Sequence, residues 1–166
     1  NYSLLAKECG IVMPETRLFE DKYFGVERFD RTPGGKLHVV SIASLIGADY
    51  RMPSIDYLHV FQVCAALTHS VAELWKVYRL MVFNYLIENK DDHAKNFAFI
   101  YRDGDWHLSP AFDLLPSDGM NGYHTTSIND SIEPTKDDLL AVAVKAGLNK
   151  KEAEEIFTSM KSSVKK

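Results

Sequence analysis

The sequence lacks several features that would place it in a specialised class of protein. It has two cysteines, Cys9 and Cys64, which lie inside apolar helical patterns and lack the close spacing of metal ligands or redox pairs. No apolar run approaches the roughly 18 residues that span a bilayer, and no basic segment followed by an apolar stretch opens the chain. We therefore expect two reduced cysteines in the core of a soluble, cytoplasmic protein that does not associate with membranes.

A broad basic surface is also missing. The formal net charge is -4 and the sequence pI is about 5.9, so we do not expect direct binding of nucleic acid. The basic residues near the C-terminus are interpreted as solvated helix faces, namely Lys145, Lys150, Lys151, Lys161, Lys165 and Lys166. What the chain does have is 166 residues, 46% of them hydrophobic, which suffice for one domain with its own core.

The residue patterns predict an α+β fold that is mainly helical and has small β-hairpins. A short helix over residues 2–9 is followed by Gly10, a residue typical of the position after a helix C-cap. Alternating patterns then predict strands of a small antiparallel sheet at residues 16–20, 23–29 and 37–42. We assign residues 1–50 to this helix and sheet and residues 51–166 to a helical lobe, together one continuous domain.

The second part of the chain contains four predicted helices and one hairpin. Their expected N-caps are, in chain order, Ser54, Ser70, Thr135 and Asn149. Ser70 has Glu73 three residues later, which predicts a capping box, and acids hold the same position after Thr135 and Asn149. The helix after Ser70 carries apolar residues at intervals of three and four and should be buried along most of its length. The hairpin is expected over residues 97–108, and the last two helices should end near Ala146 and Ser159.

A polar segment, residues 89–96, lies between the long helix and this hairpin. A surface turn would explain its polarity, but not the second acid, Asp113, which stands among apolar residues just beyond the hairpin. Phosphoryl transfer needs a carboxylate that orients the attacking hydroxyl and oxygen ligands for Mg²⁺. Kinases supply these as Asp and Asn five residues apart, followed after a hairpin by a metal-binding Asp. Asp91, Asn96 and Asp113 occur in that order and at that spacing.

Histidines and a lysine near this set leave alternatives open. His93 lies two positions after Asp91, where many protein kinases have a lysine that contacts the transferred phosphate, and His93 or Lys95 could donate a hydrogen bond there. Asp91, His93 and Asp113 could instead hold the catalytic metal of a hydrolase, a hypothesis that leaves Asn96 without a role. The other histidines do not cluster and are interpreted as structural, although His124 lies in a polar segment, residues 118–129, that could be an activation-loop analogue.

The pattern Asn-x-Asp-x-His-x-Lys-Asn-Phe, followed by Leu-x-Pro-x-x-Asp, resembles the HipA family of bacterial serine/threonine kinases. Its Asp-x-His-x-x-Asn core is similar to that of phosphoinositide kinases. Residues 26–31, Val-Glu-Arg-Phe-Asp-Arg, resemble the hinge of the HipA family, and residues 5–15 its helix-then-strand entry. The resemblance covers nearly the whole chain and implies the C-terminal lobe of a protein-kinase-like fold.

The resemblance also implies roles for single residues. It makes Asp91 the catalytic aspartate, assisted by His93 and Lys95, and it makes Asn96 and Asp113 ligands of Mg²⁺. ATP would be bound by Glu27 and Phe29 at the adenine, with His93 near the phosphates. The best-known members of the family are toxins that phosphorylate a glutamyl-tRNA synthetase and are restrained by a DNA-binding antitoxin. The implied partners are therefore a protein substrate, with an aminoacyl-tRNA synthetase as candidate, and an antitoxin.

The chain departs from the family in what it does not contain. It has no glycine-rich phosphate loop, no strand lysine for the α- and β-phosphates and no regulatory serine loop, and the family places all three upstream of its first residue. The chain also opens without methionine and runs directly into a helical pattern. We therefore expect further protein before residue 1, and we expect these residues alone to be inactive and to bind ATP weakly or not at all. A second hypothesis is a catalytically incompetent kinase fold that serves as a protein-binding module.

Overall fold

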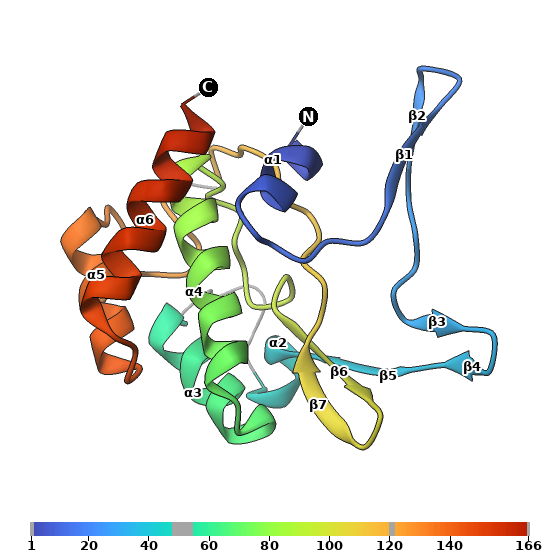
Figure 1. The fold of residues 1–166 in the computed structure, drawn as a ribbon, viewed down its shortest axis with the longest axis horizontal. Coiled ribbons are helices and arrows are strands. Elements are labelled where there is room, and N and C mark those ends of the chain that lie inside the picture. The colour runs from blue at the N-terminus through green and yellow to red at the C-terminus, as the bar shows by residue number, and fades with distance from the viewer. Residues whose placement is uncertain (1, 48–54, 120–121, 166) are drawn as a thin grey trace.

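The computed structural model describes residues 2–47, 55–119 and 122–165. Its helices form a body from which β-hairpins extend to one side (Figure 1). The helices are α1 (Tyr2–Glu8), α2 (Ile42–Leu45), α3 (Tyr57–Thr68), α4 (Val71–Leu86), α5 (Lys136–Lys145) and α6 (Lys150–Val164). The strands are β1 (Thr16–Phe19), β2 (Tyr23–Val26), β3 (Arg31–Thr32), β4 (Gly35–Lys36), β5 (His38–Ser41), β6 (Ala98–Arg102) and β7 (Asp105–Leu108).

Helix α4 is the central element of the body, as its hydrophobic period predicts. Val77, Tyr78, Met81 and Phe83 on this helix are completely buried. Helix α4 contacts α3, α5, α6 and β7, so that its apolar residues are covered on several sides. The Tyr78 hydroxyl donates a hydrogen bond of 3.0 Å to the carbonyl of Ala153 and thereby fixes α6 against α4. None of the described helices has the length and apolarity that crossing a membrane requires.

The predicted helix caps are confirmed at the two C-terminal helices, and α4 also begins directly after Ser70, its predicted N-cap position. The Thr135 amide donates to the Asp138 carboxylate at 2.8 Å, and the Asn149 side chain accepts from the amide of residue 152 at 3.1 Å. The capping box predicted at Ser70 is wrong, because the Ser70 side chain makes no capping bond. Helix α3 is capped by Asp56, whose carboxylate accepts from the amide of residue 58 at 2.8 Å. The expected cap Ser54 lies outside the described residues.

The failed capping box has a physical cause in the contacts of Glu73. This carboxylate is buried and accepts from the Leu108 amide on β7 at 2.9 Å and from Lys76 at 2.6 Å. The Glu73 carboxylate therefore connects the start of α4 to strand β7 of the β6–β7 hairpin instead of capping the helix. A distant strand outcompetes the local partner that the sequence suggests.

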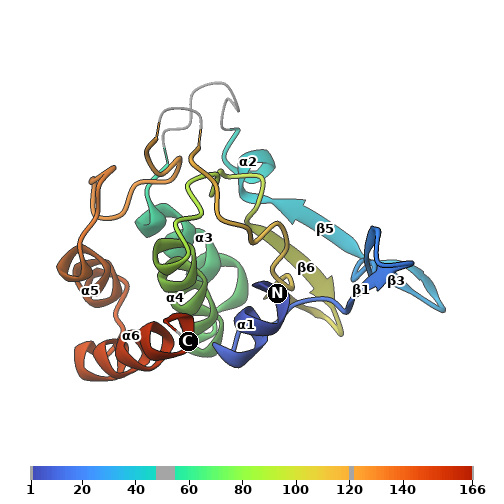
Figure 2. The same cartoon turned by 90° about the horizontal axis from the view of Figure 1, so that it is seen from above.

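The predicted strands form, but they do not make one N-terminal sheet. Strand β1 pairs with β2, and β3 pairs with β4, as two separate antiparallel hairpins. Strand β5 lies beside β6 in a three-stranded sheet with the order β5-β6-β7, in which Val39 is opposite Ile100 (Figure 2). The reason is that residues 98–100 of β6 are buried, so that both edges of β6 need hydrogen-bonding partners. Strand β5 leads directly into α2, a short helix that the sequence patterns do not predict. At its start, the Ile42 amide donates a hydrogen bond of 2.8 Å to the Phe97 carbonyl.

Candidate active site

The polar segment of residues 89–96 follows α4 directly, and its backbone is fixed by other parts of the chain. Glu88 adopts a left-handed conformation with a φ of 56°, which ends the helix and redirects the chain. The Lys90 amide donates to the Ser117 carbonyl at 3.1 Å, and the Lys90 carbonyl accepts from the Thr125 amide at 3.0 Å. The segment is therefore held by residues 117 and 125, which come after the β6–β7 hairpin.

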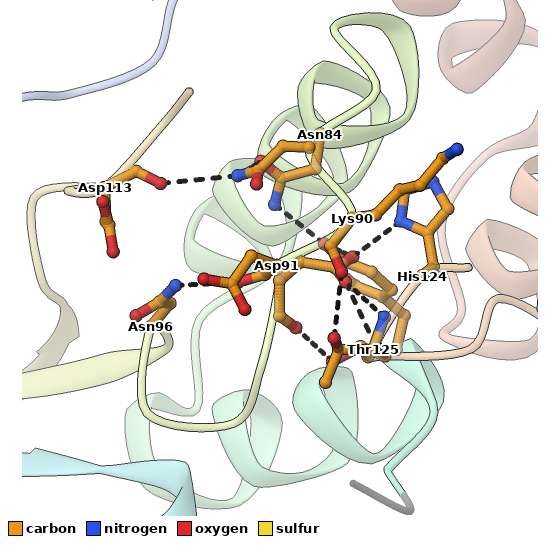
Figure 3. A network of polar contacts seen from close by, with 11 residues as sticks. Asn84, Lys90, Asp91, Asn96, Asp113, His124 and Thr125 are labelled. Carbon is orange, nitrogen blue, oxygen red and sulfur yellow. Dashed lines mark hydrogen bonds and ion pairs between the residues drawn. The ribbon is translucent and has the colours of Figure 1, made fainter. Parts of the chain in front are cut away.

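Asn96 closes this segment on itself. Its side-chain Nδ2 donates to the Asp91 carbonyl at 3.0 Å, and its backbone amide donates to the His93 carbonyl at 2.8 Å (Figure 3). Because the side-chain Nδ2 of Asn96 already donates a hydrogen bond, the side-chain Oδ1 is the atom of Asn96 that is left for a ligand. The five-residue step between Asp91 and Asn96 therefore corresponds to a direct contact between the two residues.

Asp113 is joined to the same segment through Asn89. The Asn89 Nδ2 donates to the Asp113 carbonyl at 3.4 Å and to Asn84 Oδ1 at 3.1 Å. Asp113 has a left-handed φ of 58°, and its side chain is exposed. Figure 3 shows its carboxylate pointing toward the side of the loop on which Asn96 lies, while His124 lies on the opposite side. The structure thus brings the three residues of the predicted phosphoryl-transfer set into one region.

The carboxylates of Asp91 and Asp113 are not used to hold the described fold. Neither side chain makes a hydrogen bond or ion pair with another described residue; the bonds at both residues involve their backbone carbonyls. Their charges are therefore available to a ligand. Among the described residues, no group of three His, Cys, Asp or Glu side chains could hold a metal ion. The preformed site that a metal hydrolase would need from Asp91, His93 and Asp113 is thus not found there, whereas Mg²⁺ in kinases takes some of its ligands from phosphate.

Asp92, the neighbour of Asp91, is in the opposite situation. Its side chain is completely buried and accepts from the Tyr57 hydroxyl, His124 Nδ1 and the amides of Thr125 and Thr126, each at 3.1 Å. Burial, and secondarily the negative charge of Asp92, raise the pKa of Tyr57 well above its ordinary value, so that its hydroxyl remains a donor. Asp92 was not among the predicted site residues, because two consecutive aspartates are equivalent in a sequence until one is buried.

The remaining predicted site residues lie around this centre. His93 Nδ1 is buried and has no hydrogen-bond partner in the described part of the chain, and Lys95 is exposed. The Phe29 ring stacks on Phe112 with centroids 5.9 Å apart, which places Phe29 beside the residue that precedes Asp113. Glu27 and Phe29 line a cavity of about 310 Å³, whereas Asp113 lines another of about 220 Å³, with Ala111 in the walls of both.

The chain is similar to proteins of one family. All of residues 1–166 match the family model described as HipA-like C-terminal domain. A relative from Sinorhizobium fredii (strain NBRC 101917 / NGR234), named "Putative kinase Y4dM", is 36% identical over 135 residues, in an alignment that covers 76% of this chain and 33% of the relative. The structure is also similar to a chain in the solved complex of Shewanella oneidensis MR-1 HipA, HipB and operator DNA, with a TM-score of 0.76 and 20% identity, over 96% of this chain and 45% of that chain.

These likenesses confirm the predicted fold class, mainly helical α+β with small antiparallel sheets. The chain spans a third of the length of the Sinorhizobium relative and less than half of the solved chain. Because the family model covers every residue, the chain belongs to the family of HipA-like C-terminal domains.

Proposed function

We propose that this chain is the catalytic lobe of a protein serine/threonine kinase that transfers the γ-phosphate of ATP to a protein hydroxyl. One observation carries the proposal. Asp91 and Asp113 are linked to the same loop through Asn96 and Asn89, and yet neither carboxylate is engaged by the described fold. Two unpaired acids in one region, beside an amide oxygen, are the oxygen donors that phosphoryl transfer with Mg²⁺ requires.

The proposed roles follow from the atoms that each residue leaves available. Asp91 orients the substrate hydroxyl and accepts its proton late in the reaction. Asn96 Oδ1 and the Asp113 carboxylate are the atoms that would hold Mg²⁺, a cation that prefers oxygen ligands and retains few protein contacts. When bound, Mg²⁺-ATP supplies the phosphoryl group and neutralises the charge on its oxygens. The fit is good because neither proposed ligand group makes a hydrogen bond or ion pair with another described residue.

Four other residues are proposed to lie around this centre, namely His93, Lys95, Glu27 and Phe29. A buried nitrogen without a partner is costly, so His93 Nδ1 is suited to meet a phosphate oxygen or a group bound to it. Lys95 is proposed to approach the transferred phosphate. Phe29 and Glu27 are proposed to contact the adenine, and the stacking of Phe29 on Phe112 supports a position near Asp113. The phosphate-binding residues that complete the site would come from chain beyond this domain.

Partners are proposed from likeness. The Shewanella HipA was solved together with HipB and operator DNA, and we propose an antitoxin-like protein as a partner here as well. An aminoacyl-tRNA synthetase is the candidate substrate that the family resemblance suggests. The acidic net charge of -4 favours contact with proteins over direct contact with nucleic acid.

The test is isotope transfer from γ-labelled ATP by the full-length protein. Asp91→Asn should lower kcat by about 10² to 10⁴-fold, the range associated with a general base, while ATP affinity stays within about threefold. Asp103→Asn is a matched control, because Asp103 is an exposed acid at the β6–β7 turn. Full activity in Asp91→Asn would show that its role is misassigned. A wild-type protein that binds a partner but transfers no phosphate would favour the protein-binding module instead.

A further inference from the structure

Asp92 is the one acid of the segment that the proposed chemistry does not use, and its burial needs an explanation. It is 1% exposed, although a charged carboxylate loses considerable hydration energy when it leaves water. Such burial is tolerated only where hydrogen bonds replace the lost water. The four donors that surround the Asp92 carboxylate meet this requirement.

These donors come from elements that are distant from Asp92 in the sequence. Oδ1 accepts from the amides of Thr125 and Thr126, and Oδ2 accepts from Tyr57 at the start of α3 and from His124. Because a carboxylate can only accept, Nδ1 of His124 is the ring nitrogen that carries a hydrogen in this contact. One side chain thus connects the loop, the first turn of α3 and residues 124–126.

The same contacts restrict the backbone on both sides of Asp91. Before it, the Lys90 carbonyl accepts from the Thr125 amide at 3.0 Å and from the Thr125 hydroxyl at 2.9 Å. After it, the Asp92 carbonyl accepts from the Thr126 hydroxyl. The Asp91 carbonyl itself accepts from Asn96. The backbone around Asp91 is therefore fixed, because the carbonyls of residues 90, 91 and 92 each accept a hydrogen bond, while the Asp91 carboxylate makes no hydrogen bond with the described residues.

We infer that Asp92 is a positioning residue of the proposed phosphoryl transfer, which fixes the loop bearing Asp91 and Asn96 against residues 124–126. The inference rests on the proposed function. Asp91 and Asp92 have opposite environments, one partly exposed and unpaired and the other buried and fully bonded. Anchoring the second side chain sets the direction of the first, and pre-organisation of this kind is what a catalytic carboxylate requires.

The test compares Asp92→Asn with wild type in the full-length protein. An asparagine has nearly the same shape, but its Nδ2 would face either two amide donors or the Tyr57 and His124 donors. We expect kcat to fall about 100-fold, because misplacing a catalytic group by about 1 Å costs a factor of this order, and KM for ATP to stay within about twofold. Because unfolding of part of the protein would also lower the apparent kcat at unchanged KM, kcat is calculated per folded molecule, with the folded fraction measured by circular dichroism.

Two further variants keep the test decisive. Tyr57→Phe removes a single donor from Asp92 and keeps the ring, which is buried in the core, so it should lower kcat several-fold with unchanged KM even if Asp92→Asn fails to fold. Ile156→Ala on α6 is the stability control, since it should lower the melting temperature without affecting kcat of the folded protein.

The outcomes distinguish the two proposals. An active wild type, with kcat reduced in the folded Asp92 and Tyr57 variants but not in Ile156→Ala, supports the positioning role. An active wild type whose kcat is unchanged in the folded Asp92 variant, or in Tyr57→Phe where Asp92→Asn does not fold, overturns this inference and leaves the proposed function intact. A wild-type protein without phosphate transfer overturns both.

Discussion

Asn89→Ala should measure how strongly the fold depends on the link between the two halves of the candidate site. Asn89 is 2% exposed, and its Nδ2 donates to Asn84 Oδ1 at 3.1 Å and to the Asp113 carbonyl at 3.4 Å. Alanine removes both bonds. Water can hydrate the carbonyl of Asp113, a residue whose side chain is exposed, but Asn84 is 3% exposed and its Oδ1 would be left buried without this donor.

The expected loss of stability is about 2–3 kcal/mol, obtained from about 1 kcal/mol for a lost hydrogen bond and 1–2 kcal/mol for the unsatisfied acceptor. The longer 3.4 Å bond contributes little to this sum. Urea denaturation followed by tryptophan fluorescence would report the change, since Trp75 and Trp106 belong to the body and the sheet. Asn149→Ala is the control, because loss of this N-cap at the surface should cost about 1 kcal/mol.

A second substitution at the same position sharpens the test. Asn89→Asp keeps the size of the side chain but directs only acceptors at Asn84 Oδ1 and the Asp113 carbonyl. It should therefore destabilise the chain at least as much as alanine does. If both variants unfold within about 0.5 kcal/mol of wild type, the side chain of Asn89 does not bridge these groups and the account of the link is wrong.

Three other predictions concern the wider fold. Gly119→Ala should destabilise the chain by about 2 kcal/mol in urea denaturation, because Gly119 has a φ of 63° and an added Cβ would lie 2.9 Å from a backbone oxygen and 3.1 Å from Lys90 Cβ. A variant as stable as wild type would contradict the close approach of Gly119 to Lys90. Burial raises the pKa of the Cys9 thiol, and it raises the pKa of the Cys64 thiol to about 12. Neither thiol should therefore react with a disulfide reagent at pH 8 until the chain is unfolded in urea, and fast labelling of either cysteine in the native chain would refute this prediction. Hydrogen bonds from Asn129 and from Thr135 lower the pKa of Asp138 below its ordinary value of 3.8, so its contribution to stability is present above pH 3.8 and is lost as the pH falls through the lowered pKa. The urea midpoint should therefore vary less with pH below pH 5 in Asp138→Asn than in wild type, and an equal pH dependence of the two midpoints would contradict the assignment.

The features that the sequence predicts correctly are those determined by neighbouring residues. Helix α4 follows from its apolar period, the β6–β7 hairpin from the turn at Asp103 and Gly104, and the two C-terminal caps from residue pairs three apart. The order and spacing of Asp91, Asn96 and Asp113 predict a candidate site, and its chemical role stays a prediction. A contact such as Asn96 to the Asp91 carbonyl spans only five residues, so local spacing can anticipate it.

The features that the sequence does not predict depend on contacts between distant segments. The pairing of β5 with β6 was missed because the alternation of residues 37–42 defines a strand but not its partner. The sequence predicts a capping box for Glu73, but its carboxylate accepts a hydrogen bond from the Leu108 amide instead. Asp92 escaped notice for the same reason, because its donors lie more than thirty residues away along the chain.

The difference between Asp91 and Asp92 explains how one short loop can be both rigid and reactive. A carboxylate that is fully hydrogen-bonded inside the protein stabilises a single conformation, but it has no lone pair left for a substrate. A carboxylate without partners can meet a substrate, but it cannot define its own position. Placing the two side by side on one backbone separates these requirements: Asp92 and the carbonyls of residues 90–92 hold the chain, so that Asp91 can remain unpaired without becoming disordered. By this reasoning, Asp91→Asn should preserve the loop and lower phosphate transfer by about 10² to 10⁴-fold, whereas Asp92→Asn should weaken both the loop and the transfer.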